Sequence, residues 1–144
     1  MKKNLRMTLA GLAVAATFVA LPAAAEMMKF KVLLSAAEEV PPGASKGTGT
    51  LDVTFDSATK KLTWNGTYMG LTGASSAAHF HGPAAAGANA GVLVAAPAPA
   101  SPFDGHATLT DAQAADLMAG KVYFNVHTAA NPNGEIRGQI SKAK

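Results

Sequence analysis

The sequence predicts an all-β protein, an antiparallel β-sandwich or barrel-like single domain with one short helix. Two observations carry this prediction. Short segments in which apolar and polar residues alternate, the pattern of a half-buried strand, recur between residues 28 and 140. One stretch, residues 111–119, instead combines a helical apolar spacing with capping residues at its ends. We therefore expect many short strands, joined by turns, and a single helix late in the chain.

Three strands are expected in the first part of the domain. The first covers residues 28–37 and ends before the prolines and glycine at 41–43, because proline lacks the N–H that a sheet needs. The second and third cover residues 47–55 and 61–68. They enclose a predicted turn at 56–59, so we expect them to form a hairpin.

The middle of the chain, residues 70–105, is rich in Gly, Ala, Pro and Ser. It contains two short strand candidates, residues 77–81 and 92–95. Residues 95–102 are predicted to form a proline-rich loop that lies over the domain. A linker between two domains is the alternative, but the residues from 106 onward are too few to fold alone.

The last part of the chain contains the helix and the most strongly alternating strand. A short strand is expected at residues 106–109. Thr110 is the predicted N-cap of the helix, with Gln113 at the spacing of a capping box and Gly120 as the stop. The final hairpin is predicted from strands at 121–128 and 135–140 around a turn at 131–134.

The first 25 residues have the features of an export signal. Lys2, Lys3 and Arg6 form a basic start, an apolar run follows, and Ala23-Ala24-Ala25 supplies a small-residue cleavage site. A retained membrane anchor is disfavoured because the apolar run is short for a bilayer. We expect residues 1–25 to be a signal peptide and residues 26–144 to be exported, to the periplasm or the medium, without a membrane anchor.

Charge and residue content narrow the function classes. Removing Lys2, Lys3 and Arg6 from the twelve basic residues leaves nine, which balance the nine acidic ones. No basic stripe remains for a nucleic acid. The sequence has no cysteine, and it lacks a G-x-S-x-G elbow, a P-loop and a dinucleotide fingerprint. These absences favour a binding protein over an enzyme, without deciding the question.

Three of the four histidines lie in two short segments that are predicted strands. Side chains two residues apart in a strand point to the same face, so His79 and His81 should lie about 6–7 Å apart at Cα. His127 lies on the polar face of the strand at 121–128. If this strand neighbours the one carrying His79 and His81, the three imidazoles converge. His106 stands at a loop edge and is predicted to be a surface histidine.

Polar residues of the final hairpin would surround the three imidazoles. Asn125 shares a face with His127, and Glu135 and Arg137 share a face of the returning strand. Arg137 would orient Glu135, or Glu135 would hold one tautomer of a histidine. Such a set suits copper, with zinc as the alternative. The competing interpretation is a hydrogen-bonded ridge in which Glu135 and Arg137 form an ordinary ion pair.

Four segments of the chain resemble the CHRD domain family, named from its occurrence in chordin. They are the end of the first strand with Glu38-Glu39-Val40-Pro41-Pro42, then Ala78-His79-Phe80-His81-Gly82-Pro83, Tyr123-Phe124-Asn125-Val126-His127-Thr128, and Asn131-Pro132-Asn133-Gly134-Glu135-Ile136-Arg137-Gly138-Gln139-Ile140. The resemblance spans essentially residues 26–144. It implies an extracytoplasmic β-sandwich-like domain and no established catalytic residues.

The favoured hypothesis is an exported β domain that binds a metal ion, copper before zinc, through His79, His81 and His127. The first rival is a non-metal interaction or adhesion module whose polar face meets another protein or a polymer. The second rival is a dismutase-like redox enzyme. A weaker similarity to Cu/Zn superoxide dismutase rests on the His-x-His pair alone, because the cysteine pair and a zinc-site set are missing.

Overall fold

The structure is a computed structural model that describes residues 24–97 and 100–142. It confirms the predicted class, antiparallel β with one short α-helix. The strands are β1 (Met27–Ser35), β2 (Thr48–Asp56), β3 (Lys61–Met69), β4 (Ser75–His81), β5 (Val92–Ala96), β6 (Phe103–Thr108), β7 (Val122–Thr128) and β8 (Ile136–Ile140). A 3₁₀ turn, η1 (Ala36–Glu38), follows β1, and α1 (Asp111–Met118) precedes β7. The predicted signal peptide lies outside the described residues except for its last two.

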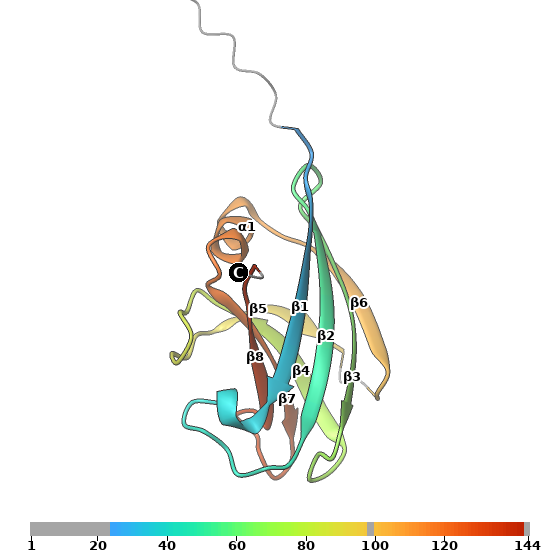
Figure 1. The fold of residues 1–144 in the computed structure, drawn as a ribbon, viewed down its shortest axis with the longest axis vertical. Coiled ribbons are helices and arrows are strands. Elements are labelled where there is room, and N and C mark those ends of the chain that lie inside the picture. Colours follow the sequence, from blue (N-terminus) through green and yellow to red (C-terminus); the bar gives the residue numbers. More distant parts are fainter. Residues whose placement is uncertain (1–23, 98–99, 143–144) are drawn as a thin grey trace, which may run out of the picture.

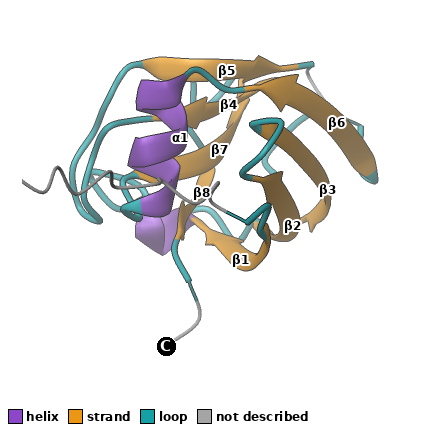
Figure 2. Cartoon of the chain, turned by 90° about the horizontal axis from the view of Figure 1, so that it is seen from above, coloured by secondary structure: helices purple, strands orange, loops and turns teal. Residues whose placement is uncertain are grey.

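Within the described residues the eight strands form one sheet in the order β5-β4-β7-β8-β1-β2-β3-β6. The predicted hairpins are both present, as β2 with β3 and β7 with β8. The sheet curls into a nearly closed barrel, with β5 and β6 as its two edges (Figures 1 and 2). Because β4 pairs with β7, segments more than 40 residues apart in the chain lie side by side.

Aromatic rings fill the inside of the barrel. Phe80 packs edge-on against both Trp64 and Phe124, with ring centroids 4.8 Å apart in each pair. Phe103 stacks on Phe124 at 5.9 Å. Gly105 lies against the Trp64 ring so closely that a Cβ at this position would overlap it. The strand predicted at residues 106–109 therefore begins three residues earlier, at Phe103, and its glycine makes room for the tryptophan.

Helix α1 lies across one end of the barrel (Figure 2). Its N-terminus has the predicted capping box: Gln113 N–H donates to Thr110 Oγ1 at 3.2 Å, and Thr110 N–H donates to Gln113 Oε1 at 2.9 Å. Leu117 is buried against the core, so the helix closes the barrel with an apolar side chain. None of the helices in the described part of the chain has the length and apolar character needed to cross a membrane.

Two loop segments cover the outer face of β4, β7 and β8. All seven residues of β7 are buried, although the alternation predicted one polar outer face. The difference arises because segments 82–91 and 129–135 bond to this face, so the polar side chains that point away from the core are buried as well. The histidines thus lie on a second, polar interior rather than on an open surface.

Candidate metal centre

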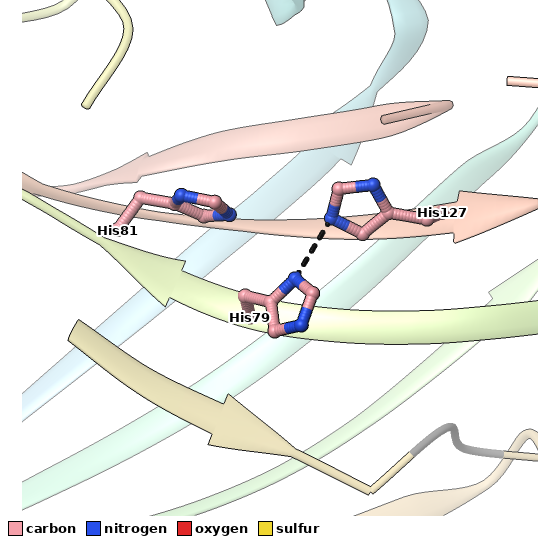
Figure 3. A group of neighbouring side chains, drawn as sticks. All are labelled: His79, His81 and His127. Atoms are coloured by element: carbon pink, nitrogen blue, oxygen red, sulfur yellow. Dashed lines mark hydrogen bonds between the residues drawn. The ribbon is translucent and has the colours of Figure 1, made fainter. Parts of the chain in front are cut away.

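The pairing of β4 with β7 brings the three histidines together, as predicted. The register places Ala77 opposite His127 and His79 opposite Asn125. His79 and His81 share the outer face of β4, with ring centroids 5.5 Å apart. The ring of His127 lies 4.8 Å from that of His79 and 6.1 Å from that of His81 (Figure 3). One nitrogen of each ring lies within 4.8 Å of the others.

This spacing is close to that of a bound metal ion. A metal with ligand nitrogens at 2.0–2.1 Å keeps them within roughly 4 Å of each other. The closest pair, His79 Nδ1 and His127 Nε2, is already 3.0 Å apart. The limit of 4.8 Å for the whole set means that the rings need to draw together by no more than about 1 Å.

Backbone carbonyls select the nitrogen that each buried histidine offers. Nδ1 of His81 lies 3.0 Å from the Ala90 carbonyl oxygen, and Nδ1 of His127 lies 2.9 Å from that of Pro132. A carbonyl oxygen only accepts, so the proton of a neutral His127 lies on Nδ1 and its Nε2 is left as a ligand. The His81 ring faces a second acceptor, Asn125 Oδ1, 3.0 Å from Nε2, so its Nε2 is left as a ligand only when its single proton lies on Nδ1 toward Ala90. His79 differs, because its Nδ1 faces the other rings.

The surroundings favour neutral imidazoles. Burial, together with the neighbouring His127 and His81, lowers the pKa of His79 below its ordinary value. Burial also lowers the pKa of His81, against the opposing effect of its bonds to Ala90 and Asn125. The charge of Arg137 adds to this lowering. Neutral rings keep a lone pair available, which is the form that a metal ion binds.

Asn125 lies in the middle of the group. Its side chain is 2% exposed, its Oδ1 lies 3.0 Å from His81 Nε2, and its Nδ2 donates to the Asn133 carbonyl at 3.4 Å. When His81 is neutral with its proton on Nδ1, the lone pair of Nε2 faces the lone pairs of Oδ1. In that tautomer the two acceptors face each other unless a donor or a cation lies between or beside them.

Glu135 and Arg137 do not behave as the sequence suggested. The described residues contain no ion pair between them, and neither contacts a histidine through a hydrogen bond. Glu135 lies just before β8 and accepts bonds from three hydroxyls, those of Ser45 at 2.6 Å, Thr72 at 2.8 Å and Thr128 at 2.6 Å. Burial opposes ionisation, but these bonds prevail and lower the pKa of Glu135 to about 2.

Arg137 is held by a different set of groups. Its side chain is 2% exposed, and its Cζ lies 3.4 Å from the centre of the Tyr123 ring. Nη1 donates to Asn89 Oδ1 at 2.9 Å, and Nη2 donates to the Ala88 carbonyl at 2.7 Å. Arg137 therefore contacts segment 82–91 and Tyr123 rather than Glu135, whose own partners lie in other loops.

Two residues near the site were missed by the sequence analysis. Tyr123 stacks on His81 with ring centroids 4.8 Å apart and planes 4° from parallel. Glu39 is 7% exposed, and burial raises its pKa to about 7 although Arg137 and Asn125 both oppose the rise. Neither has a local sequence signal for this role, because Tyr123 meets His81 through the long-range pairing of β7 with β4 and Glu39 lies in the segment after η1. His106, predicted to be a surface histidine, is exposed on β6.

A comparison with protein families matches residues 30–140 of the chain to the family model described as the CHRD domain. The match runs from the fourth residue of β1 to the end of β8 and therefore includes the three histidines and every contact described for them. No curated protein and no solved structure matches the chain.

Proposed function

This chain belongs to the CHRD domain family, and from that membership and the histidine geometry we propose that it is an exported β-domain protein that binds a copper ion. The ligands are His79 through Nδ1, and His81 and His127 through Nε2. Asn125 lies beside the ion. The observation that carries the proposal is the convergence of three imidazoles, one nitrogen of each within 4.8 Å of the others, while Nδ1 of His81 and of His127 faces a backbone carbonyl.

Nitrogen ligands and the order of metal affinities favour copper. Imidazole suits Cu(II) and Zn(II), and for a given site the divalent affinities peak at copper. A carboxylate-rich set would have favoured magnesium or calcium, but the carboxylate nearest in sequence, Glu135, is fully engaged by hydroxyls. Zinc is the competing ion, and a titration in which copper and zinc compete for the site shows which of the two binds more tightly.

Loading the site requires one proton to move. Without metal, His79 Nδ1 and His127 Nε2 lie 3.0 Å apart and share a proton. Since Nδ1 of His127 already donates to Pro132, the shared proton belongs to His79 Nδ1. For Nδ1 of His79 to act as a ligand, this proton would have to leave Nδ1 while Nε2 of the same half-buried ring gains one, which gives the other neutral tautomer.

The test is a copper titration of residues 26–144 followed by calorimetry and electron paramagnetic resonance. We expect one Cu(II) per chain with nitrogen hyperfine splitting. His79→Ala and His127→Ala should each abolish tight binding, whereas His106→Ala, an exposed histidine on another strand, should leave it unchanged. Circular dichroism should show all three variants folded, because the core face of β4 and β7 is carried by Phe80 and Val126. Binding that survives in His127→Ala would refute the site.

Export forms part of the proposal and has its own test. Cleavage after Ala25 leaves Glu26 as the first residue, one position before β1. Mass spectrometry of the protein recovered outside the cytoplasm should give a chain beginning at Glu26. An uncleaved chain that stays with the membrane would contradict this prediction.

A further inference from the structure

The His81 ring lies between two acceptors, the Ala90 carbonyl 3.0 Å from Nδ1 and Asn125 Oδ1 3.0 Å from Nε2, and the Ala90 carbonyl is held by buried side chains of β7 and β8. The Tyr123 hydroxyl donates to the Ala90 carbonyl and accepts from the Ala90 N–H, each at 3.3 Å. Arg137 fixes the two preceding residues, Ala88 and Asn89. Because β7 lies between β4 and β8, the Tyr123 ring is stacked between the His81 ring and the Arg137 guanidinium.

The carbonyl that receives the His127 proton is held in the same manner by the other charged residue. Glu135 Oε2 accepts from Thr128 Oγ1 at 2.6 Å and from Asn131 Nδ2 at 3.1 Å. Asn131 and Thr128 also bond to each other through their backbones, at 3.1 and 3.3 Å. Pro132 follows Asn131 directly, so its carbonyl is fixed in front of His127.

Which nitrogen of a histidine binds a metal is set by the hydrogen bond that the other nitrogen makes. A carbonyl held rigidly at one ring edge therefore selects the ligand atom before the ion arrives. A mobile carbonyl would let the ring rotate or change tautomer, and the ion would then have to supply the free energy of ordering it.

We propose that Arg137 with Tyr123, and Glu135 with Asn131, are two separate positioning devices that keep the proton of His81 and of His127 on Nδ1. Each device acts through a backbone carbonyl, that of Ala90 or that of Pro132. The purpose assigned to them, presenting Nε2 to copper, rests on the proposed function. The tautomers themselves exist in the metal-free protein and are measured there.

The experiment records long-range ¹H–¹⁵N spectra of the imidazoles in metal-free, ¹⁵N-labelled protein at pH 7.5. Both buried histidines of the unaltered protein should show the proton on Nδ1. Tyr123→Phe keeps the stacked ring and removes the hydroxyl, and Asn89→Ala removes the Arg137 acceptor from an exposed position. Both should mix the tautomers of His81 and leave His127 unchanged.

For the second device we expect the reverse pattern, in which His127 changes and His81 does not. Asn131→Ala removes a donor to Glu135 and should mix the tautomers of His127 while leaving His81 unchanged. Asn133→Ala, in the same turn, is the matched control, because its exposed side chain makes no hydrogen bond in the structure. The spectra also report whether each variant is folded. If Tyr123→Phe or Asn89→Ala is unfolded, the other of these two variants tests the first device. If Asn131→Ala is unfolded, Thr128→Val replaces it as the test of the second device.

Copper titration of the same variants separates the two proposals. We expect the affinity to fall about 10- to 100-fold in each variant whose tautomers change, and to stay unchanged in Asn133→Ala. An Nε2–H tautomer in the unaltered protein, or unchanged tautomers in all three variants, would overturn the positioning role. Altered tautomers with unchanged copper affinity would overturn its purpose alone. A protein that binds no copper, with tautomers that respond as expected, would refute the proposed function and leave the positioning devices standing.

Discussion

Replacing Glu39 by glutamine should stabilise the protein at alkaline pH. The Glu39 carboxyl is 7% exposed, one of its oxygens has no hydrogen-bond partner, and its pKa is raised from 4.5 to about 7 by burial. Between these two values the unfolded chain has lost the proton while the folded chain keeps it. The folded state then binds more protons, so the free energy of unfolding falls as the pH rises through this window.

The size of the effect follows from the two pKa values. Each tenfold change in an ionisation constant corresponds to about 1.4 kcal/mol, so the span from 4.5 to about 7 corresponds to about 3 kcal/mol above pH 7. Glutamine imitates the protonated carboxyl at every pH. Glu39→Gln should therefore match the unaltered protein at pH 4 and exceed its unfolding free energy by up to about 3 kcal/mol at pH 8.

Urea denaturation at pH 4, 6 and 8 measures this difference. Glu38→Gln is the matched control, because Glu38 is the preceding residue and its side chain is exposed, so its curves should follow the unaltered protein at each pH. The reasoning fails if Glu39→Gln is less stable than the unaltered protein at pH 8. That result would mean that the attraction between Glu39 and Arg137 outweighs the cost of burying the carboxylate.

Three further predictions concern the turns and the histidines. Gly134→Ala should lower the free energy of unfolding, measured in urea, by about 2–4 kcal/mol, because Gly134 has φ +128° and a Cβ there would overlap Glu39 and Asn125. Gly87→Ala is the control: Gly87 has φ +83° but open space around it, so this change should lower the free energy of unfolding by only about 1 kcal/mol. Glu135→Gln should destabilise the protein by about 1–3 kcal/mol at pH 7 and by progressively less as the pH falls through 4.5 toward 2. The reason is that a carboxyl with a lowered pKa stabilises the fold only while it is ionised. Equal losses of unfolding free energy at pH 2 and pH 7 would contradict this. Copper affinity, measured by competition with a chelator, should stay constant from pH 8 to about 6.5 and fall at lower pH, because the lowered pKa values of His79 and His81 delay protonation of the ligands. An affinity that is already lost at pH 6.5 would refute this prediction.

Period-two alternation was sufficient to predict most of the fold. The apolar residues of β1, β2 and β7 occupy the inner face as expected, and the turns between β2 and β3 and between β7 and β8 produce the predicted hairpins. The same period placed His79 and His81 on one face. Their meeting with His127 depends on the pairing of β4 with β7, which is a long-range choice, so the sequence allowed only a conditional prediction.

The environment of the histidines could not be predicted because loops create it. Segment 82–91 consists mostly of Ala and Gly, which carry no periodic signal, and it contributes backbone carbonyls rather than side chains. The interpretations that linked Glu135 to Arg137, including the alternative of an ordinary ion pair, assumed an open surface. Loops cover that surface, so Glu135 accepts hydrogen bonds from hydroxyls and Arg137 donates to a backbone carbonyl, and the two charges do not pair with each other.

The three histidines differ in how far solvent reaches them, since His81 and His127 are each 8% exposed and His79 is only half-buried. An ion that enters the proposed site would therefore meet the His79 ring before the other two, and on leaving it would leave that ring last. Rotation of an accessible side chain takes far less time than the opening of a domain. If the proposed ion binds, the rates of its uptake and release should follow the motion of the His79 ring, while the deeper pair retains its geometry and the barrel stays closed.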